Sequence, residues 1–501
     1  MRSICFSPPL PGPALRALTA LLSLLGPLAE ISRGEREAVG HLQGEMAGEV
    51  TASTVILQTR LTKTQVNHAG DLLGSSGITR FQWANNDRFE NAQHTPWRHA
   101  HAEQDWIVKT KISGLEANTT YFYRIEFGPD QKQAKRGETR EFQTLCSPDT
   151  IARHHFVVVT GMNYAFFHHG DGKKRPAYSG KDKHLGYPAL KSILDLRPDF
   201  FVGTGDNVYY DHPQSGRAQT AQAMRKKWHQ QFIQPRFVNL FGSLATYWEK
   251  DDHDFRLNDS DNSGDYLPDR DLGIAIFREQ VPIVEPNDRT ATTYRTHRAG
   301  KLLQLWFTEN RDYRSDNKLP DNAQKTIWGD KQKKWLQRSL LASDATFKIL
   351  VSPTPMIGPD GASKIDNHCN FNGFRHERDT FFAWASKHNL LNRGLYLICG
   401  DRHWQYHSID PSGMEEFSCG ALIDANSRLG IKPGIAKSTD PEGRVRQPYT
   451  SRNPSGGFLS VVIEPNPKQA VATLRFEFYD EHRKLLHSVE KRRAYTNTPT
   501  E

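Results

Sequence analysis

Five short clusters of carboxylate, imidazole, phenol and amide side chains occur in the chain, and each follows an apolar run. They read "TGMNY" (160–164), "GDNVY" (205–209), "KDDHD" (250–254), "ENRDYR" (309–314) and "GDRHW" (400–404). Carboxylate oxygens combined with imidazole suit Fe, Mn, Zn or Ca, whereas Cu(I) prefers sulfur ligands. A single Asp after a strand is usually a helix cap or a turn former. The repetition of such clusters therefore indicates one metal site assembled from several loops.

The apolar runs before these clusters predict the strands that position them. Runs such as "HHFVVVTG" (154–161) and "DFFVGTGD" (199–206) alternate with helical patterns such as "YPALKSILDL" (187–196). Continuous apolar runs are typical of strands that are buried on both faces, as in a layered α/β domain. Ligand groups in such sheets gather at the carboxyl ends of the strands, so we expect the five clusters to converge.

Three further segments complete the predicted α/β region. The segment 220–243 is a long amphipathic stretch, and helices are predicted over 330–343 and near 377–388. Two alternating strands, 456–464 and 470–480, are joined by "PNPKQ" as a hairpin that closes a sheet. A polar loop over 430–457 separates them from the last cluster, and Lys491-Arg492-Arg493 is predicted to be a solvated tail.

The region from about Gly48 to Thr144 has a different pattern. Apolar residues recur at a period of two between Gly, Asn and Asp clusters, which is typical of a β-sandwich. Leu115 precedes Tyr121 across a short connection in "ISGLEANTTYFYRI", as in the tyrosine corner of immunoglobulin-like and fibronectin III modules. We therefore expect the Tyr121 phenol to be tied to the backbone of that turn.

Composition and the N-terminus place the chain among globular, exported proteins. It has 501 residues, 24% charged residues, a formal net charge of +8 and no nucleic-acid recognition module, so an anionic substrate fits but is not required. "ALRALTALLSLLGPLAE" follows Arg2 and predicts a signal peptide over 1–29, although an overextended start is the alternative. No other run approaches the ~18 apolar residues of a membrane span, so no transmembrane anchor is expected. We expect a monomer in the periplasm, at the cell surface or outside the cell.

The order of these motifs is similar to that of calcineurin-like metallophosphatases. "GDNVY", then "DDHD" where that family usually has Gly-Asn-His-Glu/Asp, then "GDRH" where it has Gly-His-x-His, resembles the alkaline phosphatase D (PhoD-like) branch. "TENRDYRSD" and "GDKQKKWLQRSLLASDATFKILVSPTPM" support this resemblance, which spans roughly residues 48–480. It implies an α/β metallophosphatase fold, a four-layer αββα sandwich (150–488), preceded by an all-β fibronectin III-like sandwich (46–146).

The resemblance also implies a ligand set for two metal ions. Asp206 would bridge the metals, and Tyr209 would bind the first as phenolate, which favours Fe(III). His403 would complete the first site. Asp252 and Asp401 would hold the second metal, and a site of carboxylates and water is hard enough for Ca(II). Mn or Zn are the alternatives.

Two further residues receive catalytic roles from the same resemblance. His253 would lie near the leaving-group oxygen, either as general acid or as a hydrogen-bond donor to the phosphoryl group. Arg311 would clamp a phosphate oxygen with two parallel hydrogen bonds. The implied reaction is hydrolysis of a phosphate monoester or diester by a metal-activated water.

One ligand of the family is missing. The family has a cysteine at the end of the first core strand, and this chain has Thr160-Gly161-Met162-Asn163 there. Asn163 or a water would take its place, so the identity of the first metal stays open. A catalytically silent protein that binds a surface polymer is the alternative function. For an enzyme, a phospholipid, a nucleotide and a polymer diester all stay open as substrates.

Overall fold

The computed structural model of the chain describes residues 38–495, apart from 173–174, 286–287 and 289. The signal peptide predicted over 1–29 lies outside the described residues. Within them, each helix is too short or too polar to cross a membrane.

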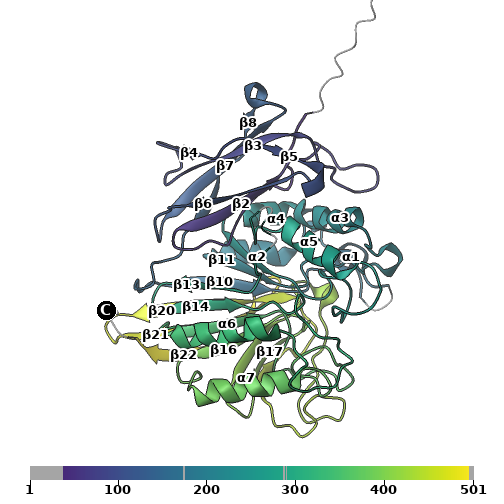
Figure 1. Cartoon of the computed structure of the whole chain (residues 1–501), viewed down its shortest axis with the longest axis vertical. Coiled ribbons are helices and arrows are strands. Elements are labelled where there is room, and N and C mark those ends of the chain that lie inside the picture. The colour runs from purple at the N-terminus through teal and green to yellow at the C-terminus, as the bar shows by residue number, and fades with distance from the viewer. Residues whose placement is uncertain (1–37, 173–174, 286–287, 289, 496–501) are drawn as a thin grey trace, which may run out of the picture. The chain divides into compact units, whose positions relative to one another are not determined.

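Among the described residues, nine strands form the first sheet. Figure 1 labels several of them, including β10, β11, β20, β21 and β22. The spatial order of the nine strands is β22 (Leu485–Ala494), β21 (Val471–Asp480), β20 (Gly457–Asn466), β10 (His154–Val159), β11 (Phe200–Thr204), β12 (Ala245–Glu249), β1 (Glu45–Gly48), β2 (Thr54–Arg60) and β6 (Ile107–Ser113). The strands β10, β11, β12 and β1 are parallel neighbours, and the flanking pairs are antiparallel. The predicted hairpin over 456–480 is confirmed as β20 and β21.

Seven strands form the second sheet. Their order is β13 (Arg295–Ala299), β14 (Leu303–Phe307), β15 (Phe347–Ser352), β16 (Leu395–Cys399), β18 (Glu415–Cys419), β17 (Gln405–Ile409) and β19 (Arg446–Thr450). The four strands β14, β15, β16 and β18 run parallel to one another. Strand β19 lies within the segment 430–457, which was predicted to be a polar loop.

Helices cover the outer face of each sheet. The helices α2 (Pro188–Leu196), α3 (Ala221–Phe232), α4 (Pro235–Phe241) and α5 (Arg270–Gln280) pack on the first sheet, and α6 (Gly329–Ala342) and α7 (Arg375–Lys387) pack on the second. The short α1 (Tyr164–His169) follows β10. The described part of the chain has five 3-10 turns, at Ala102–Gln104, Gln131–Gln133, Lys183–Leu185, Gln214–Gly216 and Asp424–Asn426. The order helix, sheet, sheet, helix confirms the predicted αββα sandwich.

Strand β10 shows why its sequence is apolar throughout. Phe156 and Val158 lie in the core between the two sheets, while Val157 and Val159 lie in the core beneath the helices. Successive side chains of a strand point to opposite faces, so a strand between two apolar layers needs apolar residues at every position.

The amphipathic segment 220–243 forms two helices, because Pro235 begins α4 and cannot continue the hydrogen-bonding pattern of α3. The expectation of a solvated tail at 491–493 was wrong. Lys491, Arg492 and Arg493 belong to β22, which pairs with β21, and not to a tail. Charged residues are common on such edge strands, where they oppose pairing with other chains.

The N-terminal strands are divided between two sheets. A third sheet contains β4 (Gln93–His94), β3 (Gly77–Ala84), β7 (Thr120–Gly128), β8 (Lys135–Arg136), β5 (Arg98–Ala100) and β9 (Arg140–Gln143). By contrast, β1, β2 and β6 extend the first sheet, and Ala47 of β1 pairs with Ala245 of β12. The Tyr121 hydroxyl accepts a hydrogen bond from the Glu116 N–H at 3.0 Å, so the predicted tyrosine corner is confirmed. The boundaries at 46–146 and 150–488 stay predictions.

Candidate metal centre

Tight turns that carry Asp206 and Asp401 follow two of the strands. Asp206 follows β11 and Asp401 follows β16, and both have positive φ angles, 54° and 56°. Asp tolerates this left-handed conformation better than most residues. Gly205 has a φ of 80°, and a Cβ there would lie 2.4 Å from the Cβ of Asp251. Only glycine therefore lets β11 turn this closely against the loop after β12.

Asp206, Tyr209 and His403 contact one another directly. The Tyr209 hydroxyl donates to Asp206 Oδ2 at 2.8 Å, and His403 Nε2 lies 3.0 Å from the same oxygen and 3.2 Å from the Tyr209 hydroxyl. Asn426 donates to the Tyr209 oxygen at 2.8 Å and thereby fixes the phenol. The three residues predicted for the first metal thus meet, although Asp206 and His403 are 197 positions apart.

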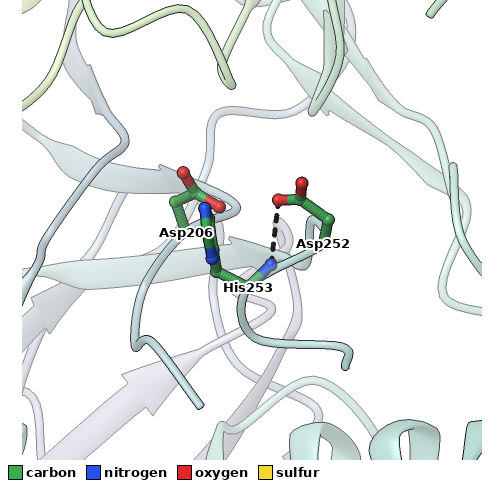
Figure 2. A group of neighbouring side chains, drawn as sticks. All are labelled: Asp206, Asp252 and His253. Carbon is green, nitrogen blue, oxygen red and sulfur yellow. Dashed lines mark hydrogen bonds between the residues drawn. The ribbon is translucent and has the colours of Figure 1, made fainter. Parts of the chain in front are cut away.

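Asp252 and His253 lie beside this group. One ligand atom from each of Asp206, Asp252 and His253 lies within 4.8 Å of the others (Figure 2). Asp252 is held by two backbone amides, its own neighbour His253 at 2.8 Å and Asp259 at 2.6 Å. Asp206 Oδ1 is buried and has no hydrogen-bond partner. A buried, unpartnered carboxylate oxygen among other donors is what a bound cation would satisfy, so these residues fit a metal site.

The electrostatics of the group favour a cation as well. Burial raises the pKa of Asp206 well above its usual range, and the carboxylates of Asp252 and Asp251 add to the rise against the opposing effect of His253. Burial, followed by the Asp206 charge, also raises the pKa of Tyr209. These shifts arise because negative charge is crowded in a space that excludes water, and a bound cation would relieve the crowding.

His253 is held by Asp211, a carboxylate that belongs to none of the motifs. Its Nδ1 lies 2.7 Å from Asp211 Oδ1, and the other Asp211 oxygen accepts from the Asn258 N–H at 3.0 Å. Burial lowers the pKa of His253, but the charges of Asp252, Asp211 and Asp206 outweigh it and raise the pKa well above its usual range. Only its position two residues after Tyr209 hinted at this role for Asp211.

Asp401 lies in a second polar group next to the first. One of its oxygens accepts from Asn367 Nδ2 at 2.8 Å and also pairs with Arg402. Both oxygens of the neighbouring Asp366 are buried without a hydrogen bond, and Lys364 Nζ lies 3.6 Å from one of them. Asp401 is thus near the centre but is not one of the three residues within 4.8 Å of one another. Neither Asp366 nor Asn367 belongs to one of the five sequence clusters.

The two arginines near the centre differ in what they already bind. Arg311 is fully buried, and it donates through Nε to Asp251 at 2.8 Å and through Nη1 to the Ser260 carbonyl at 2.6 Å. Arg428 is exposed, its N–H donates to the His403 carbonyl at 2.9 Å, and its guanidinium lies 5.4 Å from the Trp404 ring. Among the described residues, none forms an ion pair with Arg428. The clamp predicted for Arg311 stays a prediction, and Arg428 was missed because no motif marks it.

Asn163 lies next to the centre with its carboxamide already engaged. Its oxygen accepts from the Phe166 N–H at 3.1 Å and so caps α1, while its nitrogen lies 2.7 Å from His212 Nδ1. The proposed substitution of Asn163 for the missing thiolate stays a prediction. It would require the oxygen to leave the helix cap.

Two family models match the chain. The model described as PhoD-like phosphatase covers residues 156–447, and the model described as PhoD-like phosphatase, N-terminal domain, covers 29–143. A curated relative, alkaline phosphatase D of Bacillus subtilis (strain 168), is 23% identical over 408 residues, which are 73% of this chain and 64% of the relative. The matched region thus spans less than two thirds of that relative's length.

Two solved structures share the fold. The structure of PhoD matches with a TM-score of 0.69 and 17% identity, over 88% of this chain and 86% of that one. Purple acid phosphatase PPD1 from yellow lupin (Lupinus luteus) seeds matches with a TM-score of 0.59 and 12% identity. This match covers 93% of the present chain and 77% of the lupin chain. At these identities the similarity establishes the fold alone.

Proposed function

Because the chain belongs to the PhoD-like phosphatase family, we propose that it hydrolyses phosphate esters at the centre around Asp206. The family predicted from the motifs is confirmed by the family match over more than half of the chain. The activity of this particular chain and its substrates are proposals. The observation that best supports these proposals is that Asp206, Tyr209 and His403 contact one another and that the buried Oδ1 of Asp206 has no hydrogen-bond partner.

We assign two metal ions to the centre. Asp206, Tyr209 and His403 would hold the first, with Fe(III) suited to the phenolate, and Asp252 and Asp401 would hold the second, with Ca(II) suited to carboxylates. Mn or Zn are alternatives. When bound, such a pair lowers the pKa of a water to near neutrality and neutralises charge on the phosphoryl oxygens.

We propose that His253 donates a proton to the oxygen of the leaving alcohol. His253 keeps its proton near neutral pH because Asp211 and Asp252 stabilise the imidazolium. Water forms a new bond to phosphorus, the bond to the leaving oxygen breaks, and His253 donates the proton that this oxygen needs. A hydrogen bond from His253 to the phosphoryl group is the other role open to it. No covalent bond between enzyme and substrate is required.

The alternative is a silent binding protein with a metallophosphatase fold. The absent thiolate and the engaged oxygen of Asn163 are the observations in its favour. Export to the periplasm, the cell surface or the medium is a further part of the proposal, supported by the apolar segment within 1–29.

The test uses p-nitrophenyl phosphate and bis-p-nitrophenyl phosphate with protein of measured metal content. Asp206→Asn and His403→Ala should each reduce turnover by more than the 10- to 100-fold that removing an outer-shell partner typically costs. His407→Ala is the matched control, because His407 pairs with Glu415 at 2.7 Å, away from the centre. Full activity in both centre variants would reject the assignment, whereas an inactive, metal-free wild type would favour the binding protein.

A further inference from the structure

A cationic pocket adjoins the candidate centre. It has a volume of about 410 Å³ and lies between α1, the loop after β11 and α3. The basic residues along its wall are His169, His212, Arg217, Lys226 and Lys227. None of the described residues that line it is Asp or Glu. A concave site with one sign of charge concentrates ions of the opposite sign.

Tyr209 and His212 form the wall that this pocket shares with the centre. The Tyr209 hydroxyl contacts Asp206, and the same residue lines the pocket. The His212 ring stacks between Phe166 and Tyr209, with centroids 4.7 Å and 5.2 Å away. A group bound in the pocket therefore lies one aromatic side chain away from the proposed reaction site.

Several donors in the pocket are available to a ligand. Arg217 is exposed, and no ion pair joins it to another described residue. Lys227 donates to the His212 carbonyl at 2.5 Å, and burial lowers its pKa to about 8, so it stays mostly protonated at neutral pH. The charge of Asp211 partly opposes this lowering of the Lys227 pKa, and the Asp211 carboxylate is itself bound to His253 Nδ1 at 2.7 Å.

The helix α3 adds to the positive potential. It has twelve residues, Ala221–Phe232, and Ala223 in its first turn lines the pocket. The N-terminus of a helix carries partial positive charge and favours anions.

We propose that this pocket binds a second phosphate group on the leaving part of the ester, so that the preferred substrates are bisphosphorylated esters. The role of the pocket as a substrate subsite rests on the proposed phosphatase function. Binding of a phosphate group in the pocket can be measured whether or not the protein hydrolyses the ligand. Arg217 and Lys226 supply charge to the pocket, and His212 and Lys227 supply donors at the wall next to Tyr209.

The test compares adenosine 3′-phosphate with adenosine 3′,5′-bisphosphate, which differ only in the second phosphate. The wild type should bind the bisphosphate about tenfold more tightly in calorimetry, and kcat/KM should favour it by a similar factor, as expected for charge-assisted hydrogen bonds. Arg217→Ala should remove most of this preference and leave the monophosphate values unchanged. Arg217→Glu should reverse it.

Arg338→Ala is the control. Arg338 is an exposed arginine on α6, and its replacement changes the net charge by the same amount as Arg217→Ala. The inference would be overturned if the wild type bound and hydrolysed the two nucleotides equally well. It would also be overturned if Arg217→Glu kept the wild-type preference for the bisphosphate, or if it weakened the binding of both nucleotides equally. Tight, Arg217-dependent binding of the bisphosphate by a protein that hydrolyses neither ligand would support the pocket and reject the phosphatase function.

Discussion

The two arginines beside the centre predict opposite experimental phenotypes. No described residue forms an ion pair with Arg428, which lies next to His403, whereas the donors of Arg311 are used inside the protein. A phosphate could approach the Arg428 guanidinium without breaking an ion pair between described residues, but it would have to displace Asp251 from Arg311.

Arg428→Ala should raise KM for p-nitrophenyl phosphate about tenfold with an unchanged melting temperature, because a charged hydrogen bond of about 1.5 kcal/mol or more is lost. Steady-state kinetics and thermal unfolding measure both quantities. Arg444→Ala is the control, because this exposed arginine pairs with Glu442 at 2.6 Å in the same loop region. An unchanged KM would exclude Arg428 from substrate binding.

Arg311→Ala should instead lower the free energy of unfolding by about 3–5 kcal/mol, because it leaves the buried Asp251 carboxylate unpaired. Urea unfolding followed by circular dichroism measures this loss. A variant of wild-type stability with a greatly raised KM would show that Arg311 is the phosphate clamp after all.

Residue types and spacing were sufficient to predict part of the site. Asp206, Tyr209 and His403 follow predicted strands, and parallel strands bring their ends to one edge, so their convergence could be anticipated. Asp211 and Arg428 could not be predicted in this way. Their roles depend on how two loops fold against His253 and Trp404, and no periodicity in the sequence encodes those contacts.

At the scale of elements, α3 is tied to the N-terminal strands by a buried charge network. His229 of α3 lies between Asp71 at 2.7 Å and Asp105 at 2.6 Å, and Asp105 also binds Arg60 at 2.9 Å. Burial alone would raise the pKa of Asp105, but the hydrogen bond from His229 and the charge of Arg60 lower it to about 2.

Because the folded-state pKa lies below the usual 3.8, ionised Asp105 stabilises the protein above pH 4, by about 2 kcal/mol. This contribution is lost as the pH falls from about 4 through about 2. Asp105→Asn should therefore destabilise the protein by about 3–5 kcal/mol at pH 7, and the difference from wild type should narrow below pH 4. Denaturant unfolding at several pH values tests this, with the exposed Asp87→Asn as control. A difference independent of pH would contradict the role of the Asp105 charge.

Strands and turns could be predicted where a pattern within a short stretch of sequence determines them. The apolar runs gave β10, β11 and β16, and the tyrosine corner at Tyr121 follows from a local turn. The pairing of β1 with β12 was not foreseen, because a parallel contact between residues about 200 positions apart leaves no local pattern. The same holds for β22, whose charges resemble those of a solvated tail.

At the scale of the whole molecule, the first sheet runs without a break from the C-terminal hairpin into the N-terminal strands. Strand β12 hydrogen-bonds to β11 on one side and to β1 on the other. A variant that lacks residues 1–148 would therefore expose the β12 edge, with its apolar faces, to solvent.

Such a variant should aggregate or unfold without a cooperative transition, and co-expression of residues 38–148 as a separate chain should restore solubility. Size-exclusion chromatography and thermal unfolding of the two preparations measure this. A soluble, truncated monomer with the unfolding midpoint of the full chain would show that 150–488 is independent of the strands before it.

The distribution of the centre over two sheets also sets an order of events during biosynthesis. Asp206 leaves a strand of the first sheet, whereas His403 follows a strand of the second. On the ribosome, the chain can offer only part of the ligand set until residue 403 has emerged and both sheets have packed. If the centre binds metal ions as proposed, loading would be a late, largely post-translational step, and the compartment in which folding finishes would determine which ion the centre takes up.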